Sequence, residues 1–156
     1  MLNITILSVG KIKESYWREA LDEYVKRLKP YSKLEFWEVP EEPVTSTSDR
    51  KRILDKEAKK ILKIIPDNTT IIAMDIAGEV FSSPVWSTKL EEWSKFGNSI
   101  TFIIGGPLGL SMDILNKAKV LLSLSKMTFT HQLARVILLE QIYRGTMILS
   151  GKTYHY

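Results

Sequence analysis

Residues 99–110 read SITFIIGGPLGL, an apolar strand pattern that runs directly into a glycine-rich turn. The run Ser99–Ile104 is almost entirely apolar, which predicts a strand covered on both faces. The turn Gly105–Leu110 matches neither the dinucleotide fingerprint G-x-G-x-x-G nor a P-loop. In an open parallel sheet, ligands bind at the carboxyl ends of strands, where glycines let a ligand approach the backbone closely. The stretch therefore predicts a ligand-binding turn, with a tight turn that holds no ligand as the alternative.

On both sides of this stretch, strand and helix patterns alternate along nearly the whole chain. Apolar runs predict further strands at Leu2–Val9, Leu34–Val39, Thr69–Asp75 and Val120–Leu124. Helical spacing and helix end signals predict helices at Ser15–Leu28, Ser48–Ile65, Ser83–Gly97, from about Ser111, and at His131–Leu149. This alternation predicts an α/β fold with a mostly parallel sheet of five to six strands, covered by helices on both faces. Residues 40–48 are too short to be an interdomain linker, so we expect one domain over residues 1–156.

Composition removes several classes of function. The 156 residues include no cysteine and only two histidines, which argues against a disulfide framework, a thiolate metal site and a zinc centre. No apolar run approaches the length of a membrane span, and the N-terminus lacks the order of basic and apolar residues that marks a signal peptide. The sequence therefore predicts a soluble, cytoplasmic protein without a metal.

Basic charge gathers toward the C-terminus. Residues 114–156 contain six Lys and Arg against Glu140 alone, whereas residues 1–113 contain 16 against 17 acidic residues. This asymmetry predicts a surface that faces a polyanion such as nucleic acid, with an ordinary solvated face as the alternative. The stretch Arg50–Lys63 is also rich in Lys and Arg, but its acids are interspersed, so it is interpreted as a solvated helix face.

The last predicted helix is apolar around most of its circumference. Its apolar residues are Leu133, Ala134, Val136, Ile137, Leu138, Leu139, Ile142, Tyr143 and Met147. A terminal helix on a small sheet has one face to bury within its own chain, so this pattern predicts a homodimer interface. The alternative is a helix that is buried entirely within the monomer.

Two further segments carry side chains suited to chemistry. Residues 124–132, LSKMTFTHQ, predict an irregular loop after the fifth strand, beside the glycine turn. His131 and Arg135 lie one helical turn apart and can face a phosphate, although His131 can equally be satisfied locally at the helix start. The C-terminal GKTYHY has the composition for stacking on a base and moving a proton. The alternative is a frayed tail, with Arg144 paired only with Glu140.

Taken in order, these motifs resemble the RlmH family, the small SPOUT-superfamily methyltransferases of bacterial large-subunit ribosomal RNA. The likeness covers the whole chain and rests on the opening strand with Val9-Gly10-Lys11, GGPLGL at 105–110, LSKMTF at 124–129 with His131 and Arg135, Tyr143-Arg144, and Tyr154-His155. The resemblance implies a C-terminal trefoil knot of the SPOUT type, a homodimer, and S-adenosylmethionine as methyl donor. It also implies methylation of N3 of the pseudouridine at position 1915 of 23S rRNA, on the assembled ribosome.

Carried over position by position, the resemblance implies three groups of site residues. The donor pocket would consist of Met74, Gly105, Leu124, Ser125, Lys126, Met127, Thr128 and Phe129. Apolar side chains there can enclose the adenine while backbone groups fix its polar edges, although Met74 alone reads as core packing. The catalytic residues would be Arg144, Tyr154 and His155, and the RNA-binding residues His131, Arg135 and Lys152.

Three positions depart from the family pattern, and two other functions remain open. Thr130 stands where the family usually has Pro, Gly145 where Ala is usual, and Tyr156 where a basic residue is common. Without the proline, the loop at Thr130 is expected to be less stiff. Gly145 is expected to lower the stability of the last helix, and Tyr156 to remove one phosphate contact. The alternatives are another nucleotide-cofactor enzyme at the sheet edge, which the missing fingerprint disfavours, and a non-catalytic ribosome- or RNA-binding protein, for which the basic C-terminal surface would suffice.

Overall fold

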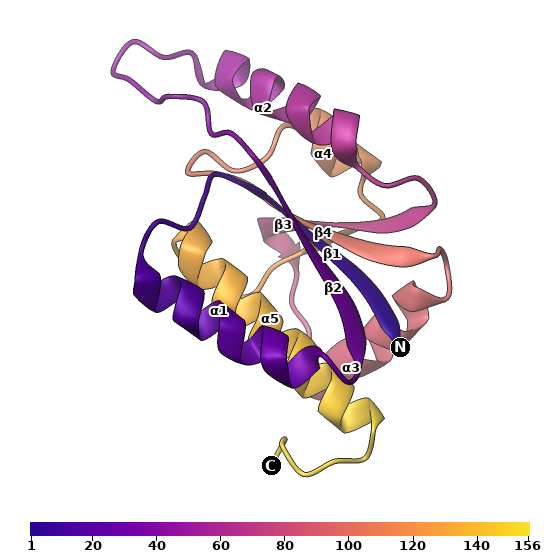
Figure 1. Cartoon of the computed structure of the whole chain (residues 1–156). Helices are drawn as coiled ribbons and strands as arrows, with labels where there is room; N and C mark the ends of the chain where they lie inside the picture. The colour runs from indigo at the N-terminus through magenta and orange to yellow at the C-terminus, as the bar shows by residue number, and fades with distance from the viewer.

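The computed structural model describes residues 1–156 and places a five-stranded parallel sheet between two layers of helices (Figure 1). The elements are β1 Leu2–Val9, α1 Ser15–Leu28, β2 Ser32–Val39, α2 Arg50–Ile64, β3 Thr69–Glu79, α3 Ser83–Ser94, β4 Ser99–Ile104, α4 Met112–Lys117, β5 Val120–Leu122 and α5 His131–Leu149. The strand order is β2-β1-β4-β3-β5, and every neighbouring pair is parallel. The predicted α/β fold and parallel sheet are confirmed.

Alternate residues of the central strands pack into two separate hydrophobic cores, one on each face of the sheet. In β1, Ile4 and Ile6 pack toward α1, α3 and α5, whereas Leu7 and Val9 pack toward α2 and α4. Figure 1 shows these two helical layers on opposite faces of the sheet. Because both faces are covered, the central strands are apolar on both sides, which is why they read as nearly continuous apolar runs.

Several predicted boundaries and orientations needed correction. β3 continues to Glu79 instead of ending at Asp75, because β5 pairs with it on both sides of an irregularity between Met74 and Glu79. β5 itself ends at Leu122, and α3 ends at Ser94 rather than at Gly97. On α2, helical spacing alone predicts that Leu62 faces inward together with Ile53, Ala58 and Ile61, but Leu62 is exposed and Glu57 is buried.

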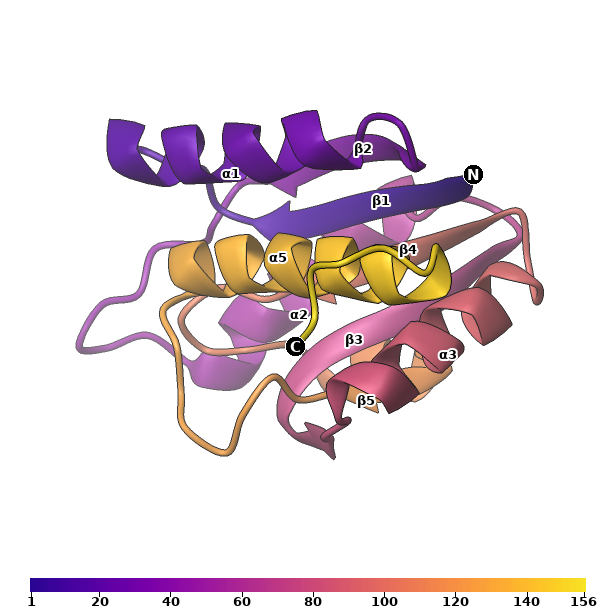
Figure 2. The same cartoon turned by 90° about the horizontal axis from the view of Figure 1, so that it is seen from below.

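The longest helix, α5, lies between α1 and α3 on the sheet (Figure 2). Leu138, Leu139 and Ile142 are fully buried in the core of that face. Although α5 is apolar almost all round, neither it nor any other helix is long and apolar enough to cross a membrane. Its own chain covers much of this apolar surface, while Leu133, Val136 and Ile137 stay partly exposed, so the homodimer interface on α5 stays a prediction.

Gly145 lets α3 and α5 approach closely. A Cβ added to Gly145 would lie 2.7 Å from Cδ1 of Leu90 and 3.0 Å from the Trp86 ring. The indole N–H of Trp86 also donates to the Gln141 carbonyl of α5 at 2.6 Å. The glycine at this position thus follows from helix packing, which offsets its lower helix propensity.

The predicted trefoil knot concerns how the segment between β5 and α5 threads past the loop after β4, and it stays a prediction.

Candidate functional site

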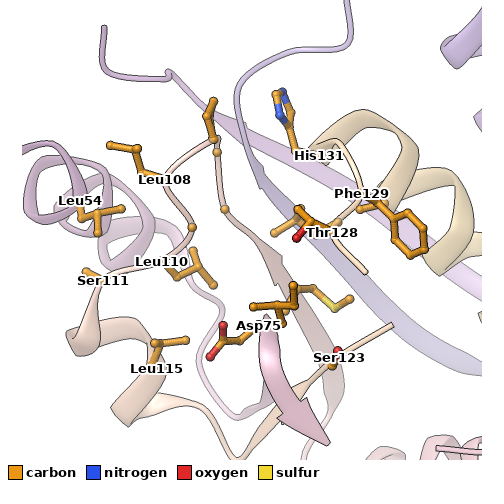
Figure 3. A pocket seen from close by; sticks show the side chains of 18 of the residues that line it. Leu54, Asp75, Leu108, Leu110, Ser111, Leu115, Ser123, Thr128, Phe129 and His131 are labelled. Atoms are coloured by element: carbon orange, nitrogen blue, oxygen red, sulfur yellow. The ribbon is translucent and has the colours of Figure 1, made fainter. Parts of the chain in front are cut away.

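A cavity of about 1080 Å³ opens at the carboxyl ends of β3, β4 and β5. Its walls are the glycine turn, the loop between β5 and α5, the end of β3 and the first turns of α2. Figure 3 shows Leu54, Leu110 and Leu115 on one side of Asp75, with Thr128 and Phe129 on the other. The cavity lies where the topology of an open parallel sheet predicts a ligand site.

The cavity brings together every predicted donor-pocket residue except Lys126. Met74 reaches it from β3, Gly105 from the turn after β4, and Leu124, Ser125, Met127, Thr128 and Phe129 from the loop before α5. Lys126 is exposed and lies outside the lining. Met127, by contrast, is 76% exposed although it lines the cavity, so its side chain is available to cover a bound molecule.

Gly105 is required by the turn itself. A Cβ at this position would lie 2.6 Å from the Gly109 carbonyl carbon, because the turn folds back on itself. The backbone N–H of Gly109 donates to the Gly106 carbonyl at 3.0 Å, and Gly109 has a φ of 84° in the region that favours glycine. The sequence argument attributed the glycine to close approach of a ligand, whereas the structure adds close approach of the turn's own backbone.

The loop between β5 and α5 is held by its own hydroxyl groups. Ser123 Oγ donates to the Ser125 carbonyl at 2.9 Å, and Ser125 Oγ accepts from the Met127 N–H at 3.0 Å. Thr130 Oγ1 accepts from the Leu133 N–H at 3.4 Å and so caps α5. The threonine that replaces the family's usual proline therefore gives the helix an N-cap.

Arg135 is not presented to a phosphate, and that prediction is corrected. Its side chain is only 4% exposed, and its guanidinium donates to Glu38 at 3.0 Å and to the carbonyls of Val9 and Gly10 at 3.1 and 2.7 Å. These contacts join α5 to the carboxyl ends of β1 and β2. A buried cation needs such partners, so Arg135 fixes the start of α5 beside the cavity.

His131 lies in the cavity wall close to an acidic side chain. A Cβ added to Gly10 would lie 4.0 Å from His131 Nε2 and 3.0 Å from Glu41 Oε2, so the imidazole and the carboxylate flank the same residue. Burial, and then the charge of Arg135, lowers the pKa of His131 below its usual 6.5. A neutral imidazole is a poor phosphate ligand, so His131 is better suited to hydrogen bonding.

The three predicted catalytic residues lie close together. Arg144 is on the second half of α5, and Tyr154 and His155 of the tail lie beside it. Arg144 pairs with Glu140, and the Tyr154 hydroxyl donates to the same carboxylate at 3.1 Å. The Arg144 guanidinium lies 4.8 Å from the centre of the Tyr154 ring and 3.4 Å from His155 Nδ1. The predicted Glu140–Arg144 pair exists, and the tail folds back over it (Figure 2).

The environment of Tyr154 keeps its phenol protonated. Burial and the neighbouring Glu140 carboxylate raise the pKa of Tyr154 to about 12. Nearby, Lys152 is exposed and packs over the Tyr31 ring at 4.8 Å from its centre. The tail thus combines a partly buried phenol with two exposed groups, Lys152 and His155, which face solvent.

The catalytic group and the cavity of one chain are far apart. Ala134 is the last α5 residue that lines the cavity, and Arg144 follows ten residues later. At 1.5 Å per residue, the two positions are about 15 Å apart along the helix axis. Within one chain, the predicted catalytic residue Arg144 is therefore set back along α5 from the part of the helix that lines the cavity.

Sequence reasoning missed one wall of the cavity. Arg50, Lys51, Leu54 and Asp55 of α2 line it, and Arg50 Nη2 donates to the Leu108 carbonyl of the glycine turn at 2.9 Å. No local pattern places α2 beside a turn that lies more than 50 residues later. Asp75 also lines the cavity, and its position directly after Met74 at a predicted strand end was the available signal.

The fold and the cavity define an α/β protein with a ligand site at the carboxyl edge of a parallel sheet. Residues 2–155 match the sequence model of the family described as "Predicted SPOUT methyltransferase". The chain therefore belongs to the SPOUT methyltransferase family and is an enzyme of that class. The match covers nearly the whole chain, so the resemblance drawn from the sequence motifs is confirmed.

The similar proteins include full-length bacterial relatives. The chain is 48% identical to "Ribosomal RNA large subunit methyltransferase H 1" of Clostridium perfringens and 48% identical to "Ribosomal RNA large subunit methyltransferase H" of Alkaliphilus oremlandii. Each alignment covers 99% of both chains. A solved structure, the SpoU methyltransferase AviRb from Streptomyces viridochromogenes in complex with AdoMet, matches with a TM-score of 0.46 and 10% identity. That alignment spans 95% of this chain and 58% of AviRb.

Proposed function

We propose that this chain methylates ribosomal RNA of the large subunit with S-adenosylmethionine as methyl donor. In its finer form, the proposal is methylation of N3 of pseudouridine 1915 in 23S rRNA, on the assembled ribosome in the cytoplasm, by a homodimer whose subunits are single domains of residues 1–156. The observation that carries it is the cavity formed by Met74, Gly105 and the loop 124–129, in a chain that aligns end to end with relatives named as ribosomal RNA methyltransferases.

The cavity fits the methyl donor in size and chemistry. Pockets for drug-sized ligands have volumes of about 300–1,000 Å³. The cavity, at about 1080 Å³, therefore has room for a nucleoside that carries a further side chain. Leu124, Met127 and Phe129 offer apolar surface to an adenine, and the open backbone of the glycine turn offers polar groups. When bound, S-adenosylmethionine supplies a methyl group on a positively charged sulfur, and methyl transfer to N3 breaks the sulfur–carbon bond and leaves its electron pair on sulfur.

The tail residues supply what the acceptor base needs. N3 must lose its proton, and the exposed imidazole of His155 is the group to which we assign its removal. Arg144 lies beside His155 and stabilises the negative charge that develops on the base. The Tyr154 phenol stays protonated, so it holds Glu140 and Arg144 in place and does not take the proton.

The separation of the two groups supports a site built from two chains. A two-fold contact through α5 places the second half of one helix near the first half of its partner. Leu133 and Ile137 are apolar, partly exposed and one turn apart on the first half of α5, and they provide the apolar part of such a contact. Each cavity would then receive Arg144 and His155 from the partner subunit.

The decisive measurement is methyl transfer from labelled S-adenosylmethionine to intact ribosomes, with the modified base mapped. Two inactive variants test the shared site. In a mixture of His155→Ala and Gly105→Val chains, half of the dimers are mixed, and one of their two sites has both groups intact. About a quarter of wild-type activity should therefore return. A mixture that stays inactive although mixed dimers form would rule out the shared site.

A further inference from the structure

The solvent face of α2 carries a row of cations. In the sequence these cations are interspersed with acids, so the row is not apparent there. Arg52, Lys56, Lys59 and Lys63 are spaced i, i+4, i+7 and i+11, so they lie on one face of the helix. All four are exposed, and none takes part in an ion pair. We call these four residues the α2 basic row. At 1.5 Å per residue the row is about 16 Å long.

The acids that are interspersed with these cations in the sequence point elsewhere. Asp55 turns into the wall of the cavity, and Glu57 is buried, where its carboxylate accepts from the Glu42 N–H at 2.9 Å. Glu42, the carboxylate nearest to the row, is occupied by Lys60 at 2.6 Å. The interpretation of α2 as a balanced solvated face therefore does not hold, because Glu57 is buried and Asp55 faces the cavity.

The charges on α2 are placed against the helix's own electrostatics. Arg50, Lys51 and Arg52 occupy the first turn, where the positive end of the helix dipole disfavours cations, and the acid at this end is the N-cap Asp49, which accepts from the Lys51 N–H at 3.0 Å. Like charges four residues apart, such as Arg52 and Lys56, also disfavour a helix. A helix selected only for stability or solubility would carry mixed charges on this face, so the arrangement points to an external anion.

We propose that the α2 basic row binds the phosphate backbone of the ribosomal RNA next to the methylated nucleotide. The inference deepens the proposed function, on which it rests. Arg50 and Lys51 of the same helix line the donor cavity, so RNA that delivers a base to the cavity mouth can continue over α2. Phosphates spaced along one strand match a straight row of exposed, unpaired cations, and such contacts position RNA without reading its sequence.

The test compares two variants that lose the same charge. The first replaces Lys56, Lys59 and Lys63 by Gln, which leaves the cavity wall intact and keeps helix propensity. The control replaces Lys29, Lys33 and Lys95 by Gln, three exposed lysines outside α2. Affinity is measured for bacterial ribosomes by co-sedimentation and for a short RNA duplex by anisotropy, each over a series of salt concentrations. Donor affinity and turnover at saturating ribosomes are measured in parallel.

We expect the α2 variant to bind both probes at least about tenfold more weakly than the control, with a salt slope reduced by about 0.7–0.9 for each lost contact. Its donor affinity and saturated turnover should match those of the control. Equal affinities for the two variants would overturn the proposal. Weaker binding to ribosomes alone would assign the row to a ribosomal protein, and weaker binding to the duplex alone would reduce it to non-specific attraction. Wild-type protein that binds ribosomes but transfers no methyl group would instead contradict the proposed function.

Discussion

Replacing Gly105 by alanine is a sharp test of the turn that bounds the donor cavity. The added methyl group would overlap the Gly109 carbonyl oxygen and lie 2.6 Å from the carbonyl carbon, both closer than real Cβ atoms approach other atoms, so the turn must open. Overpacking of this kind costs about 1–3 kcal/mol. The neighbouring Gly106→Ala is a matched control, because its methyl group would meet side chains and no backbone: Cγ1 of Val9 at 3.2 Å and Cγ of Glu41 at 3.9 Å.

The cost falls on stability or on donor affinity, depending on whether the turn keeps its shape. A turn that stays closed lowers the unfolding free energy by about 1–3 kcal/mol, and a turn that opens lowers the affinity for S-adenosylmethionine by about 5- to 150-fold. Urea unfolding and calorimetric titration with the donor measure the two quantities. Gly106→Ala should change both much less. If Gly105→Ala and Gly106→Ala behave alike in both assays, the reasoning is refuted.

Three further predictions follow from the contacts described above. Arg135→Met should cost about 3–5 kcal/mol of stability because it leaves Glu38 and two carbonyls without their partner. By contrast, Arg27→Met, which breaks an exposed pair, should cost less than about 1 kcal/mol in the same urea experiment, and equal costs would contradict the assignment. Burial raises the pKa of Glu57 above its ordinary 4.5, so the native state holds this proton to higher pH than the unfolded chain does, and stability should fall as pH rises through that window. Glu57→Gln keeps an acceptor for the Glu42 N–H and should flatten that part of the pH profile; an unchanged profile would exclude Glu57 as its source. Ile137→Glu should yield folded monomers by sedimentation, and a fully dimeric variant would place the interface elsewhere.

The fold and the place of the ligand site were accessible from local sequence features, and the methyltransferase class came from the resemblance of these motifs to a known family. The GGPLGL turn, the LSKMTF loop and the helix His131–Leu149 were predicted where the structure has them, because each depends on short-range patterns of glycine, apolar spacing and capping. The same patterns predicted that the strands are parallel, since a helix between two strands carries the chain back to the same end of the sheet. The carboxyl edge, and with it the location of the cavity, followed from that arrangement.

Only the tertiary structure decided what each exposed or charged side chain meets. Arg135 and Glu38 are 97 residues apart in the chain, so no spacing could show that the arginine is buried against β1 and β2. In the sequence, Asp55 and Glu57 of α2 look like solvent-facing partners of its lysines. In the structure, Asp55 lines the cavity and the Glu57 carboxylate accepts from the Glu42 N–H. Helical periodicity shows which side of a helix is apolar. It does not show what that side, or a charged side chain, contacts, because the contacting segments come together only when the sheet forms.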